Sequence, residues 1–211
     1  MIVSDIMSSS NEMERKSQEY IDYFERNTAR IPNIERLVKI LKSDKNPGHI
    51  VHAEFVKRFF EGGVFKITDI EVKCKGIDVD IELEHDINLQ IWHGASVSTH
   101  NIIKGKRSAL GGVETDWVKD ELKIKEKLNQ LPNKEFGLLI CYNFHIGIVL
   151  LPECINNIPD NKAIGELFHT KCDGTYQNEA RLYYSSTFKY PSLAEKVISA
   201  LGFQNVTVSY R

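Results

Sequence analysis

The sequence lacks any long apolar run. No stretch of its 211 residues approaches the ~20 consecutive apolar residues that a membrane-spanning helix needs. The opening residues, MIVSDIMSSSNEMERKSQ, are too polar for the apolar segment of a secretory signal. From these two observations we expect a soluble, cytoplasmic protein that does not use a membrane as a partner.

The sequence also has no marked excess of charge and no cysteine pattern. Its 27 basic and 29 acidic side chains give a formal net charge of −2, so the chain as a whole is not drawn to nucleic acid. Binding to phosphates would need a local basic patch. None of the four cysteines belongs to a C-x-x-C pair, and their wide spacing argues against a disulfide framework.

Several motifs of nucleotide-binding and hydrolytic enzymes are missing. The sequence contains no G-x-x-x-x-G-K-[ST] phosphate loop, no G-x-G-x-x-G and no H-E-x-x-H. It also contains no G-x-S-x-G nucleophile elbow. These absences disfavour P-loop ATPases, dinucleotide-binding enzymes and the hydrolases that depend on those motifs.

The sequence does contain helical and strand-like segments, with 42% hydrophobic residues to build a core. Amphipathic spacing predicts helices at residues 11–27, 32–44, 49–63, 115–132 and 191–202. Alternating or continuous apolar runs predict strands at residues 64–76, 77–85, 87–94, 136–144, 146–153, 180–186 and 205–210. Residues 163–169 fit either a short helix or a strand. We therefore predict an α/β fold.

Residues 77–85, IDVDIELEH, carry acids in strict alternation with aliphatic residues. Asp78, Asp80 and Glu82 are expected on one face of this strand, and the aliphatic residues on the other. A strand with one solvated face gives the same pattern. However, like charges along one strand face repel, which favours a cation or a basic partner beside them. The solvated face and the metal site both remain open at this point.

Two features together resemble a known family. One is the order of predicted elements over residues 48–153: a helix, three strands, a helix and a strand. The other is an acid in each of the first elements, Glu54 in HAEFVKRFF and Asp80 in IDVDIEL. In these features the chain resembles the restriction-endonuclease-like PD-(D/E)XK nucleases. The resemblance implies a mixed sheet flanked by helices as the core, with an N-terminal helical extension at 1–47. It leaves residues 154–211 as a C-terminal α/β extension packed on that core.

The resemblance also implies a site. In that family, acidic side chains and a lysine converge on Mg²⁺, and the lysine assists the attacking water. Glu54 and Asp80 would hold Mg²⁺ or Mn²⁺, with Asp78 as the alternative strand acid. Gln90 and Trp92 occupy the positions of the second acid and of the lysine. Glutamine offers a neutral oxygen to a hard cation, whereas tryptophan offers neither a positive charge nor a useful acid–base proton.

The missing lysine has candidate replacements, and other residues are candidate contacts to nucleic acid. Lys125 on the predicted helix 115–132 is the candidate catalytic lysine, and Lys104 and Lys106 on the adjacent loop are further candidates for the same role. Lys104, Lys106 and Arg107, in the basic segment KGKR, are expected either to contact phosphates or to form a solvated loop. Trp92 is expected either to pack within the protein or to stack on a base.

These features predict a nuclease-like protein whose metal-dependent site for phosphodiester cleavage is altered or lost. The alternative is a non-catalytic module on the same fold, which binds DNA, RNA or a protein partner, including a second copy of itself. A third hypothesis is a small-molecule or tRNA-type enzyme on an unrelated α/β fold. A structure in which Asp80 and Gln90 do not lie on neighbouring strands would favour the third.

Overall fold

The computed structural model of the chain describes residues 10–43, 47–74, 77–92, 124–143, 146–156, 158 and 179–210. Its helices are α2 (Ser10–Arg26), α3 (Ile34–Ser43), α4 (Pro47–Gly62), residues 124–130 and α8 (Pro191–Ala200), with a 3-10 helix, η1, at Pro152–Asn156. Its strands are β1 (Ile67–Cys74), β2 (Ile77–Leu83), β3 (Ile87–Trp92), β4 (Gly137–Asn143), β5 (Ile146–Leu150), β6 (Glu179–Tyr184) and β7 (Asn205–Tyr210). The predicted α/β class is confirmed. The first part of the predicted helix 115–132, and residues 163–169, lie outside the described residues.

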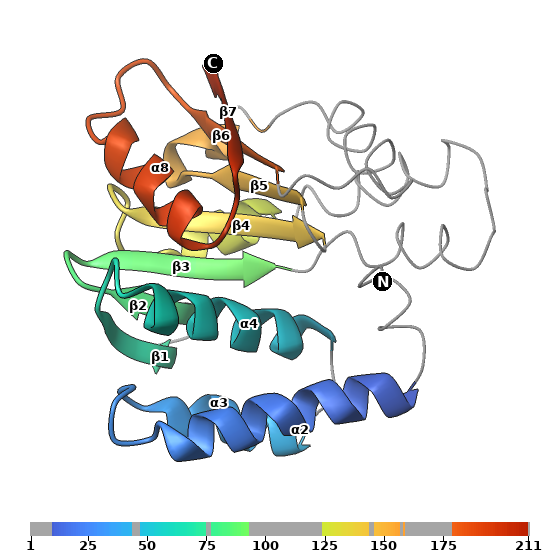
Figure 1. Cartoon of the computed structure of the whole chain (residues 1–211). Coiled ribbons are helices and arrows are strands. Elements are labelled where there is room, and N and C mark those ends of the chain that lie inside the picture. The colour runs from blue at the N-terminus through green and yellow to red at the C-terminus, as the bar shows by residue number, and fades with distance from the viewer. Residues whose placement is uncertain are drawn as a thin grey trace, which may run out of the picture.

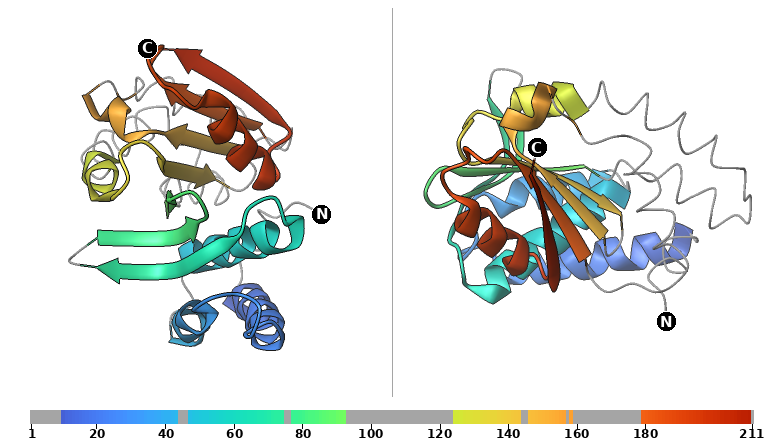
Figure 2. Two further views of the ribbon diagram at one scale, coloured as in Figure 1. Left: turned by 90° about the vertical axis from the view of Figure 1, so that its left-hand side faces the viewer. Right: turned by 90° about the horizontal axis from the view of Figure 1, so that it is seen from above.

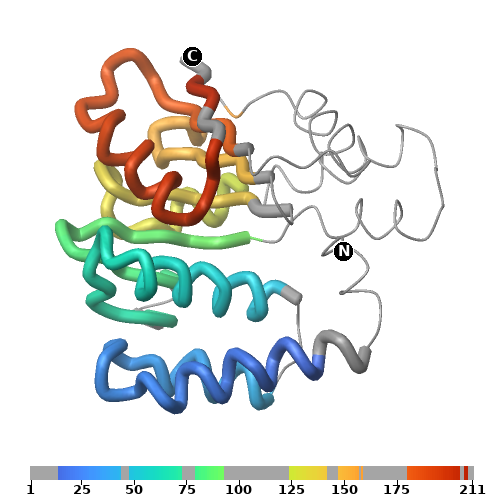
Figure 3. The backbone as a smooth tube through the Cα atoms, viewed as in Figure 1, coloured from blue at the N-terminus to red at the C-terminus, as the bar shows by residue number. Residues whose placement is uncertain are grey.

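The seven strands form one mixed sheet whose spatial order follows the sequence, from β1 at one edge to β7 at the other. Neighbouring strands β1–β2, β2–β3 and β4–β5 are antiparallel, whereas β3–β4, β5–β6 and β6–β7 are parallel. The chain therefore progresses along the sheet from the N-terminal helices to the C-terminal strand (Figure 3). Strands from the predicted nuclease-like core and from the predicted C-terminal extension share this single sheet.

Helices cover both faces of the sheet. α4 and α8 lie on one face, and the helix at 124–130 and η1 lie on the other (Figures 1 and 2). Strand β4 shows why both faces are covered, because its buried residues alternate between two cores. Leu138 and Ile140 pack with α4 and α8, whereas Leu139 and Cys141 pack with the helix at 124–130. An apolar strand in the middle of a sheet needs cover on both sides.

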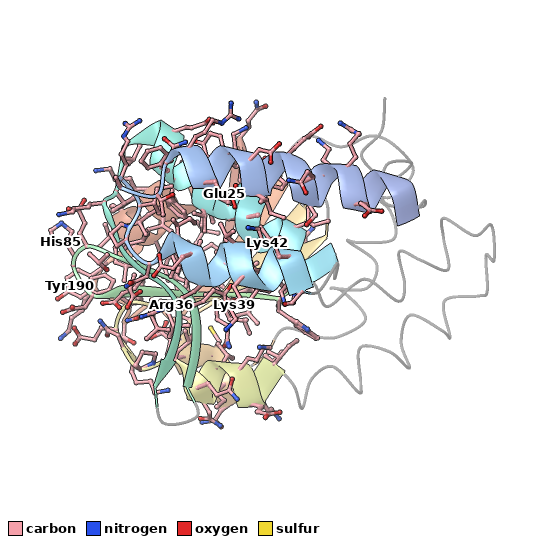
Figure 4. The ribbon with its side chains drawn as sticks, turned by 90° about the horizontal axis from the view of Figure 1, so that it is seen from below. Glu25, Arg36, Lys39, Lys42, His85 and Tyr190 are labelled. Atoms are coloured by element: carbon pink, nitrogen blue, oxygen red, sulfur yellow. The ribbon has the colours of Figure 1, made fainter. Side chains whose placement is uncertain are left out.

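α2 and α3 form an antiparallel pair against α4 and the β1 edge of the sheet. The apolar residues of α3 recur at helical spacing, and all of them are buried: Ile34, Leu37, Val38 and Leu41. Charged side chains lie on the outer surface of this pair (Figure 4). There the Lys42 ammonium lies 2.6 Å from the Glu25 carboxylate, which links α3 to α2. Such an exposed ion pair contributes little to stability.

The β1 edge of the sheet is bonded by Arg36 of α3 and by Asn33, the residue before α3. Arg36 Nη1 donates to Asp69 Oδ1 at 3.0 Å and to the backbone carbonyl of Ile70 at 3.2 Å. Asn33 Nδ2 also donates to Asp69 Oδ1, at 2.7 Å. These bonds fix the start of β1, which carries one of the site residues described below.

In the described part of the chain, no helix is both long and apolar enough to cross a membrane.

Candidate metal-binding site

The side-chain alternation of strand β1 reverses at Glu71. Ile70 is buried in the core beneath α4, whereas Val72 lines a hollow on the other side of the sheet. Residues two apart on a regular strand point to the same face, so the strand twists between these two residues. Glu71 has a backbone φ of 51°, in the left-handed region that a glutamate rarely adopts. This local conformation turns the Glu71 carboxylate into the protein, where the residue is only 8% exposed.

Strand β2 reverses in the same way at Asp80. Ile81 lies in the core beneath α4, whereas Val79 lines the hollow on the far face. In the register of β1 and β2, Ile70 pairs with Ile81 and Val72 pairs with Val79. This register places Glu71 opposite Asp80. The strict alternation expected for residues 77–85 therefore does not hold at Asp80, whose side chain is buried on the α4 side.

Strands β2 and β3 separate next to Asp80. Their backbone pairing ends at Ile81 and Leu89, and the backbone of Ile91 is bonded by side chains instead. The Ile91 N–H donates to Asp80 Oδ2 at 2.5 Å. The Ile91 carbonyl accepts from Nε2 of His52, a residue of α4, at 3.0 Å. Two side chains thus occupy the positions that a continued β2–β3 ladder would fill.

His52 lies between the two acids. Its Nδ1 is 3.3 Å from Glu71 Oε1, and its Nε2 is 3.5 Å from Asp80 Oδ2. One ligand atom from each of His52, Glu71 and Asp80 can be chosen so that all three lie within 4.8 Å of one another. The three side chains are 13%, 7% and 6% exposed. We call these three residues the His52 cluster.

The electrostatics of the cluster favour a positive charge at its centre. Burial by itself lowers the pKa of His52, because it removes water from the charged ring. The charge of Asp80, the hydrogen bond and charge of Glu71, and the bond to the Ile91 carbonyl act in the opposite direction and raise the pKa of His52 to about 9. At neutral pH, a proton on His52 therefore balances part of the charge of the two carboxylates.

The same donor atoms fit a divalent cation. An imidazole nitrogen and carboxylate oxygens are ligands of zinc and other first-row transition metals, and carboxylates also bind Mg²⁺ and Mn²⁺. The ion would take the place of the His52 proton that faces Glu71. His52, Glu71 and Asp80 can thus hold either a proton or a metal, and both would sit where strands β2 and β3 separate.

Glu54 takes part in a different network. It accepts hydrogen bonds from the Tyr20 hydroxyl and from Arg58 Nε, the latter at 2.7 Å. Arg58 Nη1 also donates to the Leu201 carbonyl, at 2.6 Å, just after α8. Burial raises the pKa of Glu54, but Tyr20 and Arg58 more than offset this and hold that pKa below its usual value. Residues two apart on a helix point in different directions, so Glu54 and His52 do not share a site.

Gln90 and Trp92 lie on the other face of the sheet. Gln90 is fully buried and donates from Nε2 to Gln130 Oε1 at 3.4 Å, on the helix at 124–130. Trp92 packs against the core beneath the same helix, as expected for a structural tryptophan. Lys125 belongs to that helix and is half-buried. The structure therefore brings Asp80 together with His52 and Glu71, but brings neither Glu54 nor Gln90 to this point.

The side chains of the remaining predicted site residues lie outside the described residues. Asp78 belongs to β2, where its backbone pairs with Lys73, but its side chain lies outside the described residues. Lys104, Lys106 and Arg107 also lie outside them, so the predicted contacts to phosphates stay predictions.

The sequence reasoning did not identify His52 and Glu71 as site residues. His52 carried a weak signal, because it falls on the same helical stripe as the buried Val56 and Phe59. A polar residue on such a stripe needs a buried partner. Glu71 carried no such signal, because a regular strand would have turned it away from Ile70.

Comparison of the chain with protein-family models, with curated proteins and with solved structures gave no match. We therefore infer function from the fold and from the geometry of the His52 cluster.

Proposed function

We propose that this protein is a nuclease-like protein of restriction-endonuclease-like fold, with an altered metal-dependent site for phosphodiester cleavage. The order α4, β1, β2, β3, helix 124–130 and β4 supports the proposal, because it matches the core order that the resemblance implies. The mixed sheet with helices on both faces also agrees with that core. DNA and RNA are the substrate classes that follow from this proposal.

The observation that carries the proposal is the assembly of His52, Glu71 and Asp80 around one point. Asp80 is the strand acid expected to bind the metal, and two further ligand types join it from β1 and α4. In this proposal His52 and Glu71 replace the helix acid and the second strand acid. The site is altered because the imidazole nitrogen of His52 takes the place of one of the oxygen ligands that the resemblance implies.

Four residues have a role in this proposal. His52, Glu71 and Asp80 hold the cation, and the backbone of Ile91 holds His52 and Asp80 in position. A bound divalent cation would supply polarisation of the scissile phosphate and a lower pKa for an attacking water. The low exposure of the three side chains keeps bulk water from competing for their lone pairs.

A cleavage assay on the full chain tests the proposal. The purified protein is incubated with Mg²⁺, Mn²⁺ or Zn²⁺ and with single- and double-stranded DNA and RNA. We expect cleavage that a chelator abolishes, that Asp80→Asn abolishes and that Glu82→Gln leaves unchanged. Glu82 is the matched control, because it lies two residues along β2 and outside the cluster. No cleavage with any of these cations and substrates contradicts the proposal.

One observation favours a second candidate, a non-catalytic binding module on the same fold. The three ligand side chains are only 13%, 7% and 6% exposed, which leaves little of their surface accessible to a phosphodiester. In that case the imidazolium of His52 is the permanent counter-charge of Glu71 and Asp80. Fluorescence anisotropy with labelled DNA and RNA would then show binding without cleavage, and Asp80→Asn would preserve it. Sedimentation of the free protein tests whether the partner is a second copy of the chain.

A further inference from the structure

We propose that the His52 cluster selects Zn²⁺, or a transition-metal ion of similar chemistry, over Mg²⁺. This inference deepens the proposed function and rests on its assignment of His52, Glu71 and Asp80 as the ligands. The resemblance implies a site made of oxygen ligands, for which Mg²⁺ is the usual ion. The cluster offers an imidazole nitrogen as well, and that difference decides the class of cation.

The spacing of the donor atoms fits a zinc ion. His52 Nδ1 and Glu71 Oε1 are 3.3 Å apart. Two atoms that are each ~2.1 Å from one zinc ion, at a tetrahedral angle, are ~3.4 Å apart. Asp80 Oδ2 lies 3.5 Å from the other ring nitrogen, Nε2. One ligand atom of each of the three residues can be chosen so that all three lie within 4.8 Å of one another, so a rotation of the Asp80 side chain toward the Nδ1 side completes three protein ligands. Three protein ligands with one position left open are typical of a catalytic zinc site.

The backbone of Ile91 orients two of the ligands. A carbonyl oxygen can only accept a hydrogen bond, so His52 Nε2 carries the proton that bonds to Ile91 at 3.0 Å. Nδ1 is then the nitrogen that faces Glu71 and binds the ion. The Ile91 N–H holds Asp80 Oδ2 at 2.5 Å. Metal-binding histidines almost always donate their second ring N–H to such a partner, which fixes the tautomer and the ring direction.

Burial and charge act against Mg²⁺. Mg²⁺ prefers near-ideal octahedral geometry and usually keeps several waters, but side chains that are 6% to 13% exposed leave little room for waters. Zn²⁺ accepts four ligands and binds imidazole strongly. A neutral His52 with two carboxylates has a charge of about −2, which a divalent cation neutralises in a region of low dielectric. Ligand type, coordination number and charge thus favour the same class of ion.

Calorimetry with the stripped full-length protein tests the inference without any nucleic acid. ZnCl₂, MnCl₂ and MgCl₂ are titrated separately into chelator-treated protein. We expect one Zn²⁺ per chain, bound at least about tenfold more tightly than Mg²⁺, with Mn²⁺ between them. Glu71→Gln and Asp80→Asn should each weaken Zn²⁺ binding by at least about tenfold. Glu82→Gln on β2 and His85→Gln in the exposed β2–β3 turn should leave the Zn²⁺ affinity unchanged.

A spectroscopic measurement on the unaltered protein covers the case in which a cluster variant fails to fold. Co²⁺ should produce the intense visible absorption of a low-coordinate site, and Zn²⁺ should abolish it. Equal affinity for Mg²⁺ and Zn²⁺, or Zn²⁺ binding that depends on His85 rather than on Asp80, overturns the inference. Tight Zn²⁺ binding without cleavage overturns only the proposed function. Cleavage supported by Mg²⁺ without a preference for Zn²⁺ overturns only this inference.

Discussion

Glu71 and Asp80 lie opposite each other on β1 and β2, at the residue where the side-chain alternation of each strand reverses. The reversal brings both carboxylates to the α4 side of the sheet, where His52 lies between them. Two buried carboxylates this close repel each other unless a cation accompanies them. Variants of the cluster and of its neighbours separate the contribution of that cation from the contribution of the surrounding network.

The charge of His52 makes stability dependent on pH. Its pKa is raised to about 9 by the fold, from about 6.5 in the unfolded chain. A raised pKa contributes stability that is fully present below the unfolded value and is lost as the pH rises through the folded value. With a chelator present, the free energy of unfolding should fall by about 2 to 3 kcal/mol between neutral pH and a pH above that of the folded group. Urea titrations at several pH values measure this, and an equal slope in His52→Gln contradicts it.

Asp80 should contribute to folding mainly through the Ile91 N–H and through His52. Asp80→Ala leaves a buried donor and a buried cation without their acceptor, so it should cost about 3 kcal/mol at neutral pH. Asp80→Asn keeps an oxygen for the Ile91 N–H and should cost roughly half as much. Urea denaturation compares them with Glu82→Ala, which should change stability by less than about 0.5 kcal/mol. Equal costs for the Ala and Asn variants would rule out the bond to Ile91 as a major contribution.

Glu54 should matter for stability and not for metal binding. Glu54→Gln removes the charge that Tyr20 and Arg58 bond, and it should cost about 1 kcal/mol because the group is partly buried. The same variant should leave the Zn²⁺ affinity measured by calorimetry within about twofold of the unaltered protein. Tyr20→Phe is the companion variant, since it breaks the same network from α2. A loss of metal affinity as large as that of Asp80→Asn would place Glu54 in the site after all.

The close contact between Gly147 on β5 and Phe203, three residues after the end of α8, should not tolerate a methyl group. A Cβ added at Gly147 would lie 2.5 Å from Cζ of Phe203, so Gly147→Ala should destabilise the protein by about 2 kcal/mol or more through overpacking. Gly62 is the control, because a Cβ there meets nothing within 4 Å. Thermal melts of Gly147→Ala and Gly62→Ala measure the difference. Similar melting temperatures for the two variants would contradict the packing shown between β5 and Phe203.

The helices and strands could be predicted from the sequence because their patterns are local. The predicted helix 11–27 is α2 at Ser10–Arg26, and the predicted strand 205–210 is β7. Strand ends differ more from the prediction, since the predicted strand 64–76 extends beyond β1 at both ends. Apolar spacing indicates which face is buried, but it does not show where hydrogen bonding to a neighbouring strand begins.

The site could be predicted only in part, because its assembly depends on a break in a regular pattern. Asp80 stood out as one acid among several on β2. A period of two placed it beside Glu82, whereas the left-handed conformation of Glu71 accompanies a turn of both strands at this point. A backbone angle of that kind in a glutamate leaves no trace in apolar spacing. The partners of Asp80 therefore became visible only in three dimensions.

Arg36 has a consequence for how copies of this protein can meet. Its guanidinium bonds the carbonyl of Ile70 on the outermost strand, so an incoming strand must first displace the Arg36 side chain before it can bond that oxygen. Exposed outer strands are the usual starting points for runaway aggregation. Here the side chain of Arg36 occupies a backbone acceptor on the edge strand β1 and so disfavours the addition of another strand there. β1 thus stays in the position in which it carries Glu71.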